Sequence, residues 1–139
     1  MISNQIYKRI FRISALYDLL VSWPFATPVT LTLVWEYAMS SLHRELGFGE
    51  LPVLGVYAVL FANFFGTVVV IWSIVRLVSD DPRLGIHDGI ARLAFSTWMI
   101  VALFSGATPL IWFFLVPEIT FGVLQLTGLT KSLNRAWQA

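Results

Sequence analysis

Long apolar runs with few interruptions dominate the pattern of hydrophobic and polar positions along this chain. Residues 53–75 include no charged side chain, and the only charge in residues 93–130 is Glu118. A helix needs about 20 apolar residues to cross a hydrocarbon core of about 30 Å. The first run therefore predicts one membrane span, over residues 53–77. The second is about twice as long as one span requires and must double back.

The stretch SGATP, residues 105–109, is the natural place for that reversal. Thr108 can cap the following helix, and Pro109 suits its first position, where no backbone N–H is needed. The spans predicted on either side cover residues 86–105 and 109–129.

The first predicted span, residues 9–23, ends in a proline-rich break with the sequence WPFATP. Pro24 and Pro28 each remove a helical hydrogen bond and clash with the preceding turn. Thr27 is suited to cap a new helix that opens at Pro28. Residues 28–45 alternate apolar and polar positions at helical spacing, which predicts an amphipathic helix lying in the membrane interface.

These elements predict an all-α integral membrane four-helix bundle with a proline-broken first span and an interfacial helix after it. The composition agrees, because the 139 residues are 58% hydrophobic and 12% charged, whereas soluble domains average about 25% charged residues. One bundle accounts for the whole length, so residues 1–139 are expected to form a single membrane domain. A net charge of +1 gives no reason to expect nucleic acid as a partner.

The distribution of basic residues predicts which side of the membrane each connection faces. Strong bases precede the first span, surround the connection between the second and third, and follow the fourth, whereas the other two connections hold only Arg44. By the positive-inside rule, both termini of this multi-pass chain are expected on the cytoplasmic side.

Small residues recur every four positions in the second predicted span, at Ala58, Ala62 and Gly66. This spacing lets helix backbones approach closely in lipid. We expect this face to serve packing inside the bundle rather than dimerisation, because a four-helix bundle needs such faces.

Polar side chains within the apolar runs are the candidate functional residues. At about 1.5 Å per residue, Glu118 and Asp18 each lie about 13 Å into the membrane, Asn63 about 15 Å and Arg92 about 9 Å. Ionisable groups at such depths are costly and call for a partner or a function. We therefore predict a polar layer of Asp18, Asn63 and Glu118 with Arg92 below it, and Trp98 is a candidate wall of an adjoining apolar cavity.

Each of these residues also has a structural interpretation. Asp88 and Arg92 are four apart on one helix and favour an ordinary ion pair. Asp18 can pair with Arg12 or Arg92, or accept a hydrogen bond from a neighbouring helix. Pro117 predicts a kink beside Glu118, so this carboxyl group either donates a hydrogen bond that joins helices or faces a cavity that the kink opens.

The sequence contains no catalytic motif that would support an enzyme, and it lacks a suitable set of ligands for a metal or haem site. The chain has no GxSxG, Walker A, GxGxxG or HExxH pattern. It has no cysteine, and its histidines, His43 and His87, fall near opposite predicted faces of the membrane, which argues against haem or a metal.

The chain resembles small bacterial inner-membrane proteins of the DoxX-like kind. The resemblance rests on the size, the four spans with cytoplasmic ends, the LYDLL stretch of residues 16–20 and the long outer segment that follows. It implies a four-helix bundle in the bacterial cytoplasmic membrane, of a type sometimes associated with quinone-linked redox complexes. It assigns no functional residues, and the WPFATP break departs from it.

Three hypotheses for function follow from these patterns. The leading one is a small membrane protein, or an accessory subunit, that binds a lipid-like or quinone-like molecule in an intramembrane pocket bounded by Glu118, Asp18, Asn63, Arg92 and Trp98. The second is a purely structural subunit of a larger membrane complex. The third is a proton or ion pathway formed by a homo-oligomer.

Overall fold

The computed structural model describes residues 4–79, 81 and 83–136, and every regular element in these ranges is helical. Residues 15–78 form one compact unit, and the residues up to 14 with those from 79 onward form a second. Helix α1, Asn4–Ser22, runs from the second unit into the first. The predicted all-α class is confirmed.

The prolines end α1 where the sequence predicts a break. A 3-10 helix, η1 (Trp23–Ala26), follows α1, and α2 (Pro28–Thr32) starts after an extended Thr27. The hydroxyl of Thr27 accepts a hydrogen bond from the backbone N–H of Thr30 at 3.2 Å, which caps α2. The helix begins here because Pro28 occupies the one turn in which its missing N–H costs nothing.

The amphipathic segment of residues 28–45 is helical throughout but changes its winding. After α2 the chain forms a π-helix, η2 (Leu33–Met39), and returns to α-helix in α3 (Ser40–Glu45). Gly47 then adopts a left-handed φ of 75°, and its N–H bonds to the Arg44 carbonyl. Such a glycine ends a helix by satisfying its last carbonyl groups.

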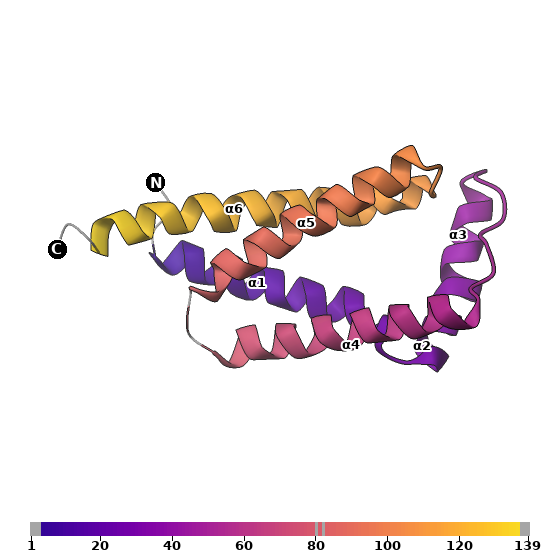
Figure 1. The fold of residues 1–139 in the computed structure, drawn as a ribbon, viewed down its shortest axis with the longest axis horizontal. Helices are drawn as coiled ribbons and strands as arrows, with labels where there is room; N and C mark the ends of the chain where they lie inside the picture. The colour runs from indigo at the N-terminus through magenta and orange to yellow at the C-terminus, as the bar shows by residue number, and fades with distance from the viewer. Residues whose placement is uncertain (1–3, 80, 82, 137–139) are drawn as a thin grey trace. The chain divides into compact units, whose positions relative to one another are not determined.

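Helix α4 (Val56–Val78) packs against the proline break within the first unit (Figure 1). The contact is centred on Gly66, where an added Cβ would lie 2.4 Å from the carbonyl carbon of Phe25 and 2.6 Å from the N atom of Ala26. Gly66, the third of the small residues spaced four apart in this helix, therefore serves close packing inside the first unit.

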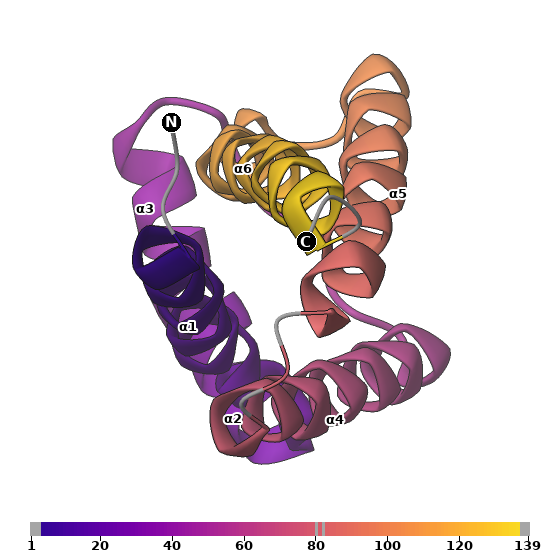
Figure 2. The ribbon, with the colours of Figure 1, turned by 90° about the vertical axis from the view of Figure 1, so that its left-hand side faces the viewer.

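Helices α5 (Leu84–Phe104) and α6 (Trp112–Ala136) form an antiparallel pair within the second unit (Figures 1 and 2). Gly106, with a φ of 88°, closes α5. Thr108 then caps the short 3-10 helix η3 (Pro109–Ile111) by accepting a hydrogen bond from the N–H of Leu110. Helix α6 continues through Pro117.

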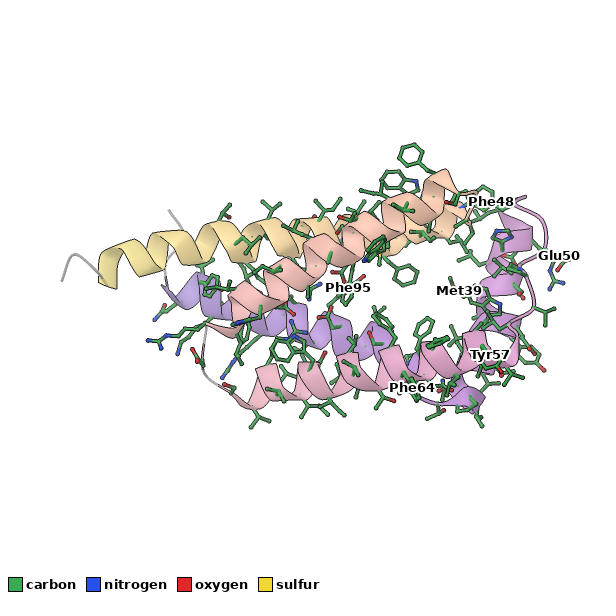
Figure 3. All side chains as sticks on the ribbon, in the orientation of Figure 1. Met39, Phe48, Glu50, Tyr57, Phe64 and Phe95 are labelled. Atoms are coloured by element: carbon green, nitrogen blue, oxygen red, sulfur yellow. The ribbon has the colours of Figure 1, made fainter. Side chains whose placement is uncertain are left out.

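Two of the four predicted spans correspond to helices that are long and apolar enough to cross a membrane. Among the described residues these are Val56–Val78 and Pro109–Gly128. Helix α1 carries several charged side chains, and α5 carries Asp88 and Arg92. Figure 3 shows apolar side chains projecting from α4, and those most exposed there include Val56, Tyr57, Phe61, Phe64 and Val68.

Adding a methyl group at Gly66 should destabilise the first unit. Because the atoms that a Cβ would meet belong to the backbone of Phe25 and Ala26, the break must move, and such overpacking costs about 1 to 3 kcal/mol. Thermal unfolding of Gly66→Ala in detergent, followed by circular dichroism, measures this loss. The control is Gly55→Ala, where an added Cβ meets nothing within 4 Å. Equal stability of the two variants would contradict the packing.

Candidate functional site

A close approach of α5 and α6 positions the polar side chains of the second unit. A Cβ added at Gly89 would lie 2.8 Å from Leu126 Cγ, and one added at Gly122 would lie 3.3 Å from Arg92 Cβ. The lack of side chains at both glycines brings the two helices near enough for polar groups on one to reach the other.

Arg92 is the centre of the polar network that this approach permits. Its Nε donates to Asp88 Oδ2 at 3.0 Å, one turn earlier on α5, and its Nη1 lies 3.1 Å from Glu118 Oε1 on α6. The Arg92 side chain is 2% exposed, and that of Glu118 is 13% exposed. Its guanidinium also lies 5.3 Å from the centre of the Phe121 ring, a distance at which a cation is attracted to an aromatic face.

Gln125 extends this network to α1. Its amide Nε2 donates at 2.8 Å both to Asp88 Oδ2 and to the hydroxyl of Ser14. The Ser14 hydroxyl in turn donates to the Phe11 carbonyl at 2.9 Å. Gln125 and Ser14 are fully buried, so the network joins three helices away from solvent.

Tyr7 packs beside the same network, between two glycines. A Cβ added at Gly85 would lie 2.1 Å from the Tyr7 hydroxyl, and one added at Gly128 would lie 2.6 Å from its ring. Burial, together with the negative charge of Asp88, raises the pKa of Tyr7 to about 12. Both effects disfavour the phenolate, because it is charged and has the same sign as Asp88.

The first unit holds a separate buried ion pair. Arg76 Nη2 donates to Asp18 Oδ2 and also to the Ser73 hydroxyl. The Arg76 side chain is fully buried. Asn63, on the same helix as Arg76, donates from Nδ2 to the Phe25 carbonyl at 2.8 Å, so its amide satisfies a backbone oxygen in the proline break.

One apolar cavity of the second unit, partly open to its surroundings, lies at the turn between α5 and α6. It has a volume of about 430 Å³ and is lined by Ile100, Leu103, Phe104, Ala107, Pro109 and Trp112. Trp98 is outside this lining, and its side chain is mostly exposed.

The structure thus brings some of the predicted site residues together and separates others by unit. Glu118 and Arg92 pair in the second unit. Asp18 and Asn63 belong to the first unit, where the bonds described above are made to different partners. The i to i+4 ion pair predicted for Asp88 and Arg92 is confirmed.

Sequence reasoning missed Gln125, Ser14 and Arg76 as members of these networks. Gln125 carries a detectable signal, because it follows Glu118 by seven residues and therefore shares its helix face. Ser14 carries none, since a lone serine on a helix commonly bonds to its own backbone. Arg76 was interpreted as a base in the connection after the second span, and its pairing with Asp18 depends on how α4 packs.

The two kinds of site have different chemical capacities. The guanidinium of Arg92 is engaged by two carboxylates and a carbonyl, which suits it to hold helices in register. The cavity offers carbon surface, which suits an apolar molecule, and its volume is within the range of about 300 to 1,000 Å³ typical of ligand pockets.

Comparison with known proteins adds no family to these observations. No family model, no curated protein and no solved structure matches this chain.

Replacing Arg92 should cost the second unit much of its stability. Arg92→Met leaves Asp88 and Glu118 without the guanidinium between them, and breaking a buried pair in this way typically costs about 3 to 5 kcal/mol. Denaturant unfolding in detergent measures the change. Arg44→Met is the control, because Arg44 and Glu50 form an exposed pair 3.8 Å apart and such pairs contribute little. A similarly small effect of both substitutions would show that the network does not stabilise the fold.

The raised pKa of Tyr7 should make the protein less stable in strong alkali. The folded pKa of about 12 exceeds the ordinary value of 10.0, so this stabilisation is complete below pH 10 and is lost as the pH rises from 10 to 12. Each pKa unit corresponds to about 1.4 kcal/mol, which gives a loss of about 2 to 3 kcal/mol.

Ultraviolet titration of phenolate formation tests this assignment. The folded protein should show a component that ionises near pH 12 and that disappears in Tyr7→Phe. Tyr37→Phe, which removes an exposed tyrosine, should retain the component. If the component disappeared in Tyr37→Phe but not in Tyr7→Phe, it would belong to Tyr37, and the assignment to Tyr7 would be wrong.

Proposed function

We propose that this chain is a small integral membrane protein that crosses the bilayer with α4 and with the η3–α6 segment. The length and apolar composition of these two helices support the proposal. The large apolar side chains exposed along α4 also support it. Soluble proteins rarely expose large continuous apolar surfaces, and contact with lipid would cover this one.

We further propose that the protein binds a lipid-like or quinone-like molecule in the cavity between α5 and α6. The observation that carries this proposal is the apolar lining of a cavity of about 430 Å³. Trp112 and Phe104 supply flat aromatic surface to this lining, and Ile100 and Leu103 supply aliphatic surface. A chain or ring without charge is the ligand that such surfaces favour.

In this proposal the polar network has a supporting role. Arg92 and Glu118 join α5 to α6, which would hold the cavity walls at a constant separation. The bonds of Asp18 to Arg76 and of Asn63 to Phe25 favour structural roles for these two residues. The ligand is therefore assigned to the cavity rather than to the predicted polar layer.

A second function, that of a structural subunit in a larger membrane complex, is favoured by the exposed apolar side chains of α4. A partner helix would cover the same surface as lipid does. This role requires no ligand in the cavity, so a binding measurement separates the two functions.

Binding of decylbenzoquinone to the detergent-purified protein tests the leading proposal. The quinone should quench the fluorescence of Trp112, and the saturable part of the quenching should disappear in Trp112→Phe. Ala107→Leu places extra carbons in the cavity and should weaken binding about tenfold or more, a loss of at least about 1.4 kcal/mol. Ala94→Leu makes the same change at an exposed position of α5 outside the lining and should bind normally.

Native mass spectrometry of the same preparation extends the test to lipids. A co-purified apolar molecule that is present in the wild type and in Ala94→Leu, and depleted in Ala107→Leu, would support the cavity as its site. If neither method detects saturable binding, the structural subunit becomes the better account.

A further inference from the structure

Strong bases gather in three stretches of the second unit. The start of α1 (residues 4–14), the approach to α5 (79–87) and the end of α6 (128–136) hold six of the nine lysines and arginines of the chain: Lys8, Arg9, Arg12, Arg83, Lys131 and Arg135. They hold two of its eight carboxylates, Asp80 and Asp81. These stretches therefore carry a formal charge of +4, and the remaining three bases and six carboxylates leave −3 for the rest of the chain.

Tyr7 places the three stretches at one level along the helices. A Cβ added at Gly128 of α6 would lie 2.6 Å from the Tyr7 ring, and one added at Gly85 of α5 would lie 2.1 Å from its hydroxyl. Lys8 and Arg9 follow Tyr7 directly in the chain. Figure 1 shows the start of α1, the start of α5 and the end of α6 at the same end of this unit. The three stretches together are called the basic end below.

The basic end is also level with the boundary of an apolar segment. Gly128, which Tyr7 contacts, is the last residue of the candidate membrane span formed by η3 and α6. Arg83 lies two residues before Gly85, or about 3 Å along the axis. In a chain that crosses the bilayer with α6, bases at this level lie beside the lipid headgroups rather than in the hydrocarbon.

The bases of this end present their charge to the surroundings. Lys8, Arg9, Arg12 and Arg83 are exposed, whereas the arginines of the two buried networks are not. Among the side chains that the structure describes, the one other exposed base is Arg44, in the first unit. A surface with this local excess of positive charge attracts anions and repels cations.

We propose that the basic end binds the headgroups of anionic lipids in the surrounding membrane. This inference rests on the membrane location proposed above and specifies the class of lipid that surrounds this end. A bilayer surface is the partner because the bases come from more than one helix and share the level at which the span ends. Near an anionic leaflet, one lysine or arginine strengthens association by about fivefold.

Spin-labelled lipids test the proposal with the full-length protein. The protein is reconstituted into phosphatidylcholine vesicles with a trace of spin-labelled phosphatidylglycerol, which is anionic, or spin-labelled phosphatidylcholine, which has no net charge. Electron spin resonance measures the share of each label whose motion the protein restricts. We expect a preference for phosphatidylglycerol of at least about fivefold. Most of it should disappear between 0.1 and 1 M salt, because the Debye length falls from about 10 Å to about 3 Å.

Single substitutions locate the preference on the protein. Arg9→Gln and Arg83→Gln should each lower it by about two- to fivefold. Both side chains are exposed, so thermal unfolding followed by circular dichroism should be unchanged. Arg44→Gln is the matched control, because it removes the same charge from an exposed arginine of the first unit. This control should keep the full preference for phosphatidylglycerol.

The outcomes separate this inference from the function on which it rests. If the protein restricts neither label, the proposed membrane location fails. If it restricts both labels equally, or if neither Arg9→Gln nor Arg83→Gln lowers the preference more than Arg44→Gln does, the membrane location stands and the basic end is overturned as a lipid site. A salt-sensitive preference that Arg9→Gln or Arg83→Gln lowers, and that Arg44→Gln retains, supports both.

Discussion

The guanidinium of Arg92 must find acceptors on two helices at once, and the second unit is arranged around that requirement. Asp88 supplies one carboxylate from the same helix, and Glu118 supplies another from α6. A charge buried to this degree is tolerated only when its donors are satisfied. The glycines at 89 and 122 permit the necessary approach of the helices, so packing and electrostatics depend on each other here.

The first unit satisfies its buried groups in a different way. Its prolines leave carbonyl groups without their usual helical donors, and Asn63 supplies a donor to one of them, at Phe25. Gly66 permits the close contact that makes this possible. The pair of Asp18 and Arg76 then joins α1 to α4 in the same unit. A backbone interruption and a buried charge are both stabilised by side chains of one helix, α4.

The apolar cavity stands apart from these networks. Its lining lies at the turn between α5 and α6, farther along α5 than Asp88 and Arg92, and the residues that line it carry no charge. The second unit thus separates its buried polar contacts from its apolar cavity along the length of the two helices.

The sequence by itself determined the helical class, the break at Pro24 and Pro28, and the caps at Thr27 and Thr108. These features depend on residues close together in the chain, whose backbone preferences act locally. It also determined the ion pair of Asp88 with Arg92, because a spacing of four residues places both on one face. Only the tertiary structure decided that Arg92 reaches Glu118, that Asp18 pairs with Arg76 and that Asn63 bonds to Phe25. Those choices depend on the rotation and separation of packed helices, which residue spacing along one helix does not specify.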